Sequence, residues 1–149
     1  MHLKPNASEE MELKPKDIEI NKLLQFYQNR QFDEAEKLAL SLSERFPKHP
    51  FSWKVLGALL KQTGRIIDSL FPTQKSVHLA PQDSSAHFNL GNTLQELGRL
   101  EEAEASYKKA IALKPDFATV HFNLGVTLHE IGREEEAEAS YKKAIAFKP

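Results

Sequence analysis

The second half of the chain is a tandem repeat, and this limits the folds that the chain can adopt. Residues 84–117 read SSAHFNLGNTLQELGRLEEAEASYKKAIALKPDF, and residues 118–149 are nearly a copy. Of the 32 positions that align without a gap, 8 differ and 24 are identical. A fixed period of roughly 20 to 50 residues is typical of stacked repeat arrays. The pattern therefore predicts units that bury their apolar faces on one another.

The same period extends into the first half of the chain. It relates three sets of residues spaced by 34 positions, namely Gly57, Gly91 and Gly125; Gly64, Gly98 and Gly132; and Pro81, Pro115 and Pro149. In each unit, two runs with apolar residues at helical spacing flank a Gly-Arg dipeptide. Because glycine readily adopts the left-handed conformation that ends many helices, each unit is predicted to be a helix–turn–helix.

These spacings resemble the tetratricopeptide repeat. Trp53, Leu56, Gly57 and Leu60 occupy the W-x2-L-G-x2-Y positions of that family. Matching residues in the next two units are His87, Leu90, Gly91, Leu94, Ala103, Tyr107, Ala110 and Pro115, then His121, Leu124, Gly125, Leu128, Ala137, Tyr141, Ala144 and Pro149. The resemblance implies an all-α, right-handed superhelical solenoid of helix–turn–helix repeats.

We expect one domain over residues 17–149, with repeats at about 16–49, 50–83, 84–117 and 118–149, after a disordered leader at 1–16. The first repeat is degenerate, since Lys22 stands where the others have leucine. Its first helix is predicted to stop at Asn29 in the left-handed conformation. In the second repeat, Pro72 and Thr73 fall within the back helix, which we expect to be kinked or to start late.

Composition and motifs exclude several functions. The net charge is −1, which disfavours nucleic-acid or acidic-membrane partners. Without cysteine there is no thiolate metal site, and His87 and His121, one period apart, occupy equivalent places rather than converging on a metal. No phosphate loop or nucleophile motif occurs, so we expect neither an enzyme nor a cofactor. The start of the chain lacks a signal peptide's apolar core, which predicts a cytoplasmic protein.

The resemblance implies a binding groove lined by the first helix of each repeat. The groove is predicted to be polar, nearly uncharged and set with aromatic rings. Asn89 and Asn123, both within HFNLG, look like the asparagine ladder of O-linked N-acetylglucosamine transferases, where amides hold a peptide backbone; otherwise they are ordinary surface residues. The candidate peptide-binding residues are Lys54, Phe88, Asn89, Asn92, Phe122, Asn123 and His129. Some members of the family hold the C-terminal carboxylate of a chaperone with a clamp of lysine, asparagine and arginine residues. This clamp is disfavoured here, because only Lys54 and Asn89 match its pattern.

The sequence thus predicts a protein–protein interaction scaffold that binds an extended peptide in its groove. The alternative is the substrate-recruiting region of a longer enzyme, such as a glycosyltransferase. The last helix carries Tyr141, Ile145 and Phe147, and no polar capping helix follows Pro149. Because repeat arrays need polar caps, we expect self-association through this helix and a chain that is part of something longer.

Overall fold

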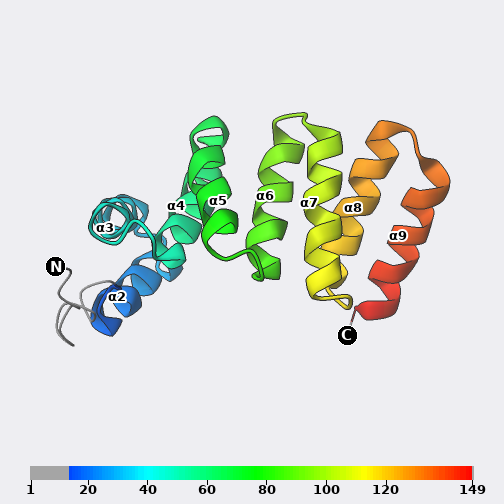
Figure 1. Cartoon of the computed structure of the whole chain (residues 1–149). Coiled ribbons are helices and arrows are strands. Elements are labelled where there is room, and N and C mark those ends of the chain that lie inside the picture. Colours follow the sequence, from blue (N-terminus) through cyan, green and yellow to red (C-terminus); the bar gives the residue numbers. More distant parts are fainter. Residues whose placement is uncertain (1–13, 149) are drawn as a thin grey trace, which may run out of the picture.

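The computed structural model describes residues 14–148, and this part of the chain contains eight α-helices and no strand (Figure 1). The helices are α2 (Asp17–Gln28), α3 (Phe32–Arg45), α4 (Pro50–Gln62), α5 (Ile66–Leu79), α6 (Ser84–Glu96), α7 (Leu100–Leu113), α8 (Ala118–Ile131) and α9 (Glu134–Phe147). Contacts are most extensive within the pairs α4–α5, α6–α7 and α8–α9, and each pair packs on the next. The helices therefore form a row with α2 and α9 at opposite ends.

The predicted all-α solenoid is confirmed by this arrangement. Most of the predicted leader, residues 1–13, lies outside the described residues, as does Pro149. Pro15, within the predicted leader, is buried. No helix in residues 14–148 has the length and apolar character needed to cross a bilayer.

Each helix pair turns through a left-handed residue at the same place in the period. These residues are Gly64 (φ 82°), Gly98 (φ 77°), Gly132 (φ 95°) and Arg30 (φ 58°). The prediction for Asn29 is wrong, because its φ is −85°. Arg30 lies 34 residues before Gly64, and its side chain stacks 5.2 Å from the ring centroid of Phe32. The place in the period sets the conformation, although a left-handed non-glycine residue costs ~1–2 kcal/mol.

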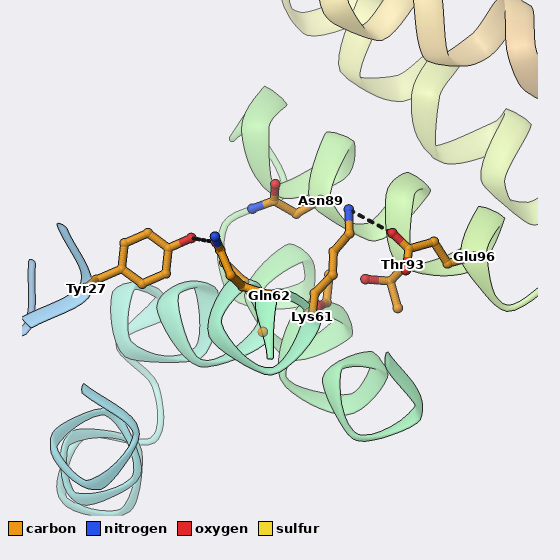
Figure 2. Close-up of a pocket in the computed structure, with 9 residues that line it drawn as sticks. Tyr27, Lys61, Gln62, Asn89, Thr93 and Glu96 are labelled. Atoms are coloured by element: carbon orange, nitrogen blue, oxygen red, sulfur yellow. Dashed lines mark hydrogen bonds and ion pairs between the residues drawn. The ribbon is translucent and has the colours of Figure 1, made fainter. Parts of the chain in front are cut away.

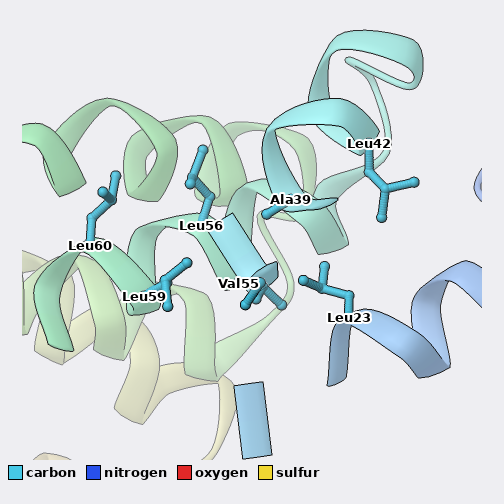
Figure 3. Close-up of a cluster of buried hydrophobic side chains, with 8 residues drawn as sticks. Leu23, Ala39, Leu42, Val55, Leu56, Leu59 and Leu60 are labelled. Atoms are coloured by element: carbon cyan, nitrogen blue, oxygen red, sulfur yellow. The ribbon is translucent and has the colours of Figure 1, made fainter. Parts of the chain in front are cut away.

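The buried apolar side chains form two clusters rather than one continuous core. The first, shown in Figure 3, joins α2, α3 and α4 and includes Leu23, Ala39, Leu42, Val55, Leu56, Leu59 and Leu60. The second joins α6 to α9 and includes Leu94, Ala103, Tyr107, Ala110, Val120, Leu124, Leu128 and Ala137. Between the clusters lies α5, whose buried residues are Ser69, Pro72, Thr73 and Ser76. Three of these four are polar, so the buried face of α5 separates the clusters, although its partly buried Leu70 packs against the second one.

The back helix of the second repeat is complete despite its internal proline. We predicted that α5 could start late at Pro72, and this is wrong. The helix begins at Ile66 and is 14 residues long, the same length as α7. Proline cannot donate a hydrogen bond to the carbonyl of Asp68, one turn earlier. Packing against α4 and α6 supports the helix through this position, an instance of tertiary contacts overriding local propensity.

The aromatic signature position carries out one task with two residue types. Trp53 Nε1 donates to the carbonyl of Pro47 at 2.9 Å. His87 Nε2 and His121 Nε2 lie 2.9 and 2.8 Å from the carbonyls of Pro81 and Pro115, the equivalent acceptors. A carbonyl oxygen can only accept, so Nε2 is the donor in both contacts. Histidine replaces tryptophan here because it keeps the ring N–H that ties each front helix to the preceding turn.

Candidate concave binding surface

The first helices of the repeats form one side of the array. Contacts join α4 to α6 and α6 to α8 directly, across the repeat boundaries. Two hollows of about 380 Å³ each lie on this side. We call the first the α4–α6 hollow; it is lined by Tyr27, Gly57, Ala58, Lys61, Gln62, Thr73, Asn89, Thr93 and Glu96. The second, the α6–α8 hollow, is lined by Lys61, Asn92, Gln95, Glu96, Asn123, Val126 and Glu130.

The two hollows adjoin at an ion pair. Lys61 and Glu96 line both hollows, and Lys61 Nζ lies 3.5 Å from Glu96 Oε1 (Figure 2). Both side chains are partly exposed, so the pair contributes at most ~1 kcal/mol and can rearrange around a ligand. With Glu130 also present, the surface is more charged than the sequence predicted. Lys61 was missed, although it stands one period before Gln95, which the same register places in the groove.

Asn89 presents an unengaged amide to the α4–α6 hollow. It is half-buried and forms no side-chain hydrogen bond within residues 14–148. An amide offers two N–H donors and a carbonyl acceptor. Asn89 can therefore bind a peptide group without first breaking a contact of its own.

Asn123 is held in place by its neighbours in the α6–α8 hollow. Its Nδ2 donates to Asn92 Oδ1 at 2.8 Å, which ties α8 to α6. Asn92 Oδ1 also lies 2.7 Å from the hydroxyl of Tyr107, which is equally close to Gln95 Oε1. Burial raises the pKa of Tyr107, so this hydroxyl stays protonated and donates. Asn123 thus has a structural role that we did not predict, and only part of its amide remains for a ligand.

Lys54 is engaged within the array. Its Nζ lies 2.8 Å from Asp83 Oδ2 and 2.5 Å from Ser85 Oγ, joining α4 to the start of α6. Asp83 Oδ1 in turn accepts from the backbone N–H groups of Ser85 and Ala86, which caps α6. Burial opposes the ionisation of Asp83, but hydrogen bonds from Lys54 and Ser85 outweigh it and hold the pKa of Asp83 below its usual range. Lys54 could contact a peptide only by leaving these partners.

The remaining predicted residues lie outside both hollows. Phe88 is half-buried, with its ring centroid 5.2 Å from that of Phe117. Phe122 is 52% exposed and packs on Tyr141. It lines a separate apolar groove of about 660 Å³, the α8–α9 groove, formed by Ala118, Thr119, Phe122, Tyr141, Ala144, Ile145 and Lys148. His129 is exposed, and its Nδ1 lies 2.8 Å from Glu134 Oε2.

The structure therefore brings together only part of the predicted set. Asn92 and Asn123 share one hollow, and Asn89 lines the other. Within residues 14–148, no three His, Asp or Glu side chains are grouped closely enough to hold a metal ion.

Family comparisons match this geometry. A model described as TPR repeat matches residues 94–132, and two described as Tetratricopeptide repeat match residues 73–105 and 118–149. Together they cover residues 73–149, just over half of the chain. No curated protein matches the sequence significantly.

Solved structures of the protein MamA have the same fold. A MamA D159K mutant is 26% identical over 89% of this chain and 77% of its own, with a TM-score of 0.77. A MamA crystal structure has a TM-score of 0.82 at 23% identity, covering 89% of this chain and 72% of that one. MamA from Desulfovibrio magneticus RS-1 has a TM-score of 0.80 at 19% identity, covering 87% and 73%.

Proposed function

Because the chain belongs to the tetratricopeptide repeat family and is a protein-interaction scaffold, we propose that its concave side binds an extended segment of a partner protein. The two adjoining hollows carry this proposal. They form a continuous polar surface across three front helices, with Lys61 and Glu96 common to both. A fold of this kind is typical of non-enzymatic scaffolds.

The spacing of the amides suits an extended backbone. Neighbouring packed helices lie ~8–10 Å apart, which is about three residues of extended chain at ~3.3 Å each. Asn89 and Asn123 stand one period apart on neighbouring front helices. Each can pair with a peptide group whatever the side chain of that residue, so the amides would supply register and affinity more than sequence preference.

Asn89→Ala tests the proposal with the least disturbance of the fold, because Asn89 makes no internal side-chain hydrogen bond in the described chain. The probes are nine-residue peptides selected from a random library on the wild-type protein. Each lost hydrogen bond costs ~0.5–1.5 kcal/mol, so affinity should fall about threefold to tenfold at ~1.4 kcal/mol per decade. Adding Asn123→Ala should bring the total loss to about tenfold or more.

Gln74→Ala is the matched control, since it removes an exposed amide from the back helix α5. Titration calorimetry of the four proteins gives the affinities. Equal affinity of the wild type and the double variant would place the binding surface elsewhere.

The alternative, a recruiting region of a longer glycosyltransferase, is not favoured by the comparisons. They also give no support to the resemblance to O-linked N-acetylglucosamine transferases. A cytoplasmic location and the absence of nucleic-acid or membrane partners remain predictions from the sequence.

A further inference from the structure

The α4–α6 hollow lies where the next repeat places a tyrosine. Seven of its lining residues correspond, one period later, to Tyr107 itself and to six residues of α6 and α8. Gly57, Ala58, Lys61, Thr73, Asn89, Thr93 and Glu96 become Gly91, Asn92, Gln95, Tyr107, Asn123, Thr127 and Glu130. Thr73 is the residue at the tyrosine position. The array thus contains one version of the site with a threonine and another version filled by a tyrosine.

The filled version shows what the site accommodates. Tyr107 is fully buried, and its ring lies flat enough on α6 that a Cβ on Gly91 would come within 2.6 Å of it. Its hydroxyl reaches Asn92 and Gln95 on the groove side. Tyr141 lies against Gly125 in the same manner. The site between a front helix, its back helix and the next front helix is therefore shaped for a phenol.

In the second repeat the side chain at this position is the shorter one of threonine. Thr73 Oγ1 turns back to the carbonyl of Ser69 at 2.7 Å. It lies against Gly57, where a Cβ would approach it to 2.5 Å, and both residues are buried. The α4–α6 hollow nevertheless reaches Gly57, Thr73 and Thr93. The α6–α8 hollow has the same volume but is not lined by the equivalent residues Gly91, Tyr107 and Thr127, because the ring of Tyr107 lies over the glycine there.

We propose that the α4–α6 hollow is a specificity pocket that receives a tyrosine side chain of the bound peptide. This inference rests on the proposed peptide-binding function. The guest ring would lie against Gly57 and Thr73, much as Tyr107 lies against Gly91. The peptide backbone on either side of it would pass the amide of Asn89. The pocket gives the scaffold a side-chain preference that the amides alone do not supply.

The rim favours tyrosine over phenylalanine. Ala58 replaces Asn92, which accepts the hydroxyl in the next repeat, but the Glu96 carboxylate lines the hollow and can accept in its place. Lys61, whose Nζ lies 3.5 Å from Glu96 Oε1, can donate to the oxygen of the phenol. On the opposite side, the Tyr27 hydroxyl donates to Gln62 Oε1 at 3.0 Å and closes the end of the hollow (Figure 2). A phenol would thus find polar partners for its hydroxyl and small residues, Gly57, Ala58 and Thr73, beneath its ring.

A direct test uses p-cresol, the tyrosine side chain as a free molecule, with the wild-type protein. Amide resonances of Gly57, Thr73 and Asn89 should shift and saturate as p-cresol is added. The control probe is 4-methylcyclohexanol, which has the same substituents on a non-planar ring and should shift them several-fold less. Shifts that do not saturate, or that gather elsewhere on the array, would overturn the proposal. This test requires neither a peptide nor a variant.

A second test fills the pocket from within. Thr73→Tyr restores the residue that the third and fourth repeats carry and should abolish the p-cresol shifts. It should also weaken library-selected peptides at least tenfold. Ala105→Tyr, on the exposed side of α7, adds the same ring away from the hollows and should change neither. Thermal melts followed by circular dichroism establish that both variants are folded.

The two proposals fail in different ways. Peptides that depend on Asn89 but carry no shared tyrosine, and bind Thr73→Tyr normally, would overturn the pocket and leave the groove function standing. Peptides unaffected by Asn89→Ala would overturn the groove function, while the p-cresol titration still decides whether the pocket accepts a phenol.

Discussion

The second and third repeats share one plan and differ in what their back helices bury. In α7 the buried face includes Ala103, Tyr107 and Ala110, which belong to an apolar cluster. One period earlier, α5 has Ser69, Thr73 and Ser76 at the same places. The Oγ atoms of Ser76 and of Ser52, in α4, are buried without a hydrogen-bond partner in the described structure. The helix α5 therefore forms at full length although polar residues replace apolar ones on its buried face, but these residues do not join an apolar cluster.

The junctions on either side of the third repeat also differ. Lys54 and Asp83 form an ion pair at 2.8 Å between the second and third repeats. One period later the same two places hold Phe88 and Phe117, whose ring centroids are 5.2 Å apart. The same two places are thus joined by an ion pair at one junction and by aromatic packing at the next.

A second cross-repeat contact is missing at the same junction. Arg65 bonds Glu36 at 2.5 Å, and Arg133 bonds Glu104 at 2.7 Å, at equivalent places two periods apart. Arg99 stands between them in the period, but its partner position is occupied by Leu70, and it pairs with Glu102 instead. The junction between the second and third repeats is therefore the one from which both an apolar core and this ion pair are absent.

The largest difference should come from truncating the two equivalent back-helix residues. Tyr107→Ala removes a fully buried ring and its hydrogen bonds, so the free energy of unfolding should fall by ~3–5 kcal/mol. Thr73→Ala removes a short side chain beside an existing hollow and should cost only ~1 kcal/mol. Urea denaturation measures both. Equal losses would show that the two repeats are packed alike.

Removing the proline from α5 and introducing one at the equivalent place in α7 should change the free energy of unfolding in opposite directions. Ser106 and Ser140 occupy the place of Pro72 in the later repeats. Pro72→Ser restores a backbone donor within α5 and should raise the free energy of unfolding by up to ~3 kcal/mol, whereas Ser106→Pro should lower it by ~3 kcal/mol or more. Guanidinium denaturation is the measurement. A loss of stability in Pro72→Ser would mean that packing of the buried ring outweighs the missing hydrogen bond.

The α8–α9 groove can be compared with the equivalent groove between α6 and α7, which α8 covers. Ile145 is 75% exposed and Phe122 52% exposed, so we expect a second copy of the chain to bind there. Burying one such side chain stabilises by ~1.5–3 kcal/mol. Ile145→Lys should therefore raise the dissociation constant about tenfold or more, as measured by light scattering over a dilution series. A wild-type protein that is monomeric at every concentration would contradict this expectation.

The smallest effect should come from the Lys54–Asp83 junction. Because the folded-state pKa of Asp83 is lowered, its charge stabilises the fold above the unfolded pKa of ~3.9. This contribution is lost as the pH falls through the lower folded value. Asp83→Asn keeps a capping side chain but loses the ion pair, so it should cost ~0.5–1 kcal/mol at pH 7. The difference should shrink below pH ~4; a difference that persists there would indicate a cost of capping rather than of charge.

The sequence by itself determined the period, and through it the architecture. Equal spacing of Gly64, Gly98 and Gly132 sets the turns, and the alternation of apolar runs sets helix pairs that must stack. These signals lie within each repeat and recur in the next one, so each repeat specifies its own turn and helix pair. Even Arg30 fits the rule once the period, rather than the residue type, is used to place the turn. The family and the fold class could therefore be predicted, as could a groove lined by front helices.

Only the tertiary structure decided which groove residues are available. Lys54, Asn89 and Asn123 are all polar residues on front helices, yet Lys54 is paired with Asp83, Asn123 donates to Asn92, and Asn89 is unengaged. The partners lie 29 and 31 positions away, and they depend on how far each side chain reaches across a repeat boundary. How deeply the α4–α6 hollow reaches between the helices is decided in a related way. What a threonine at position 73 leaves accessible depends on how α4, α5 and α6 pack around it. Residues far apart in the sequence determine that packing, so no single segment predicts it.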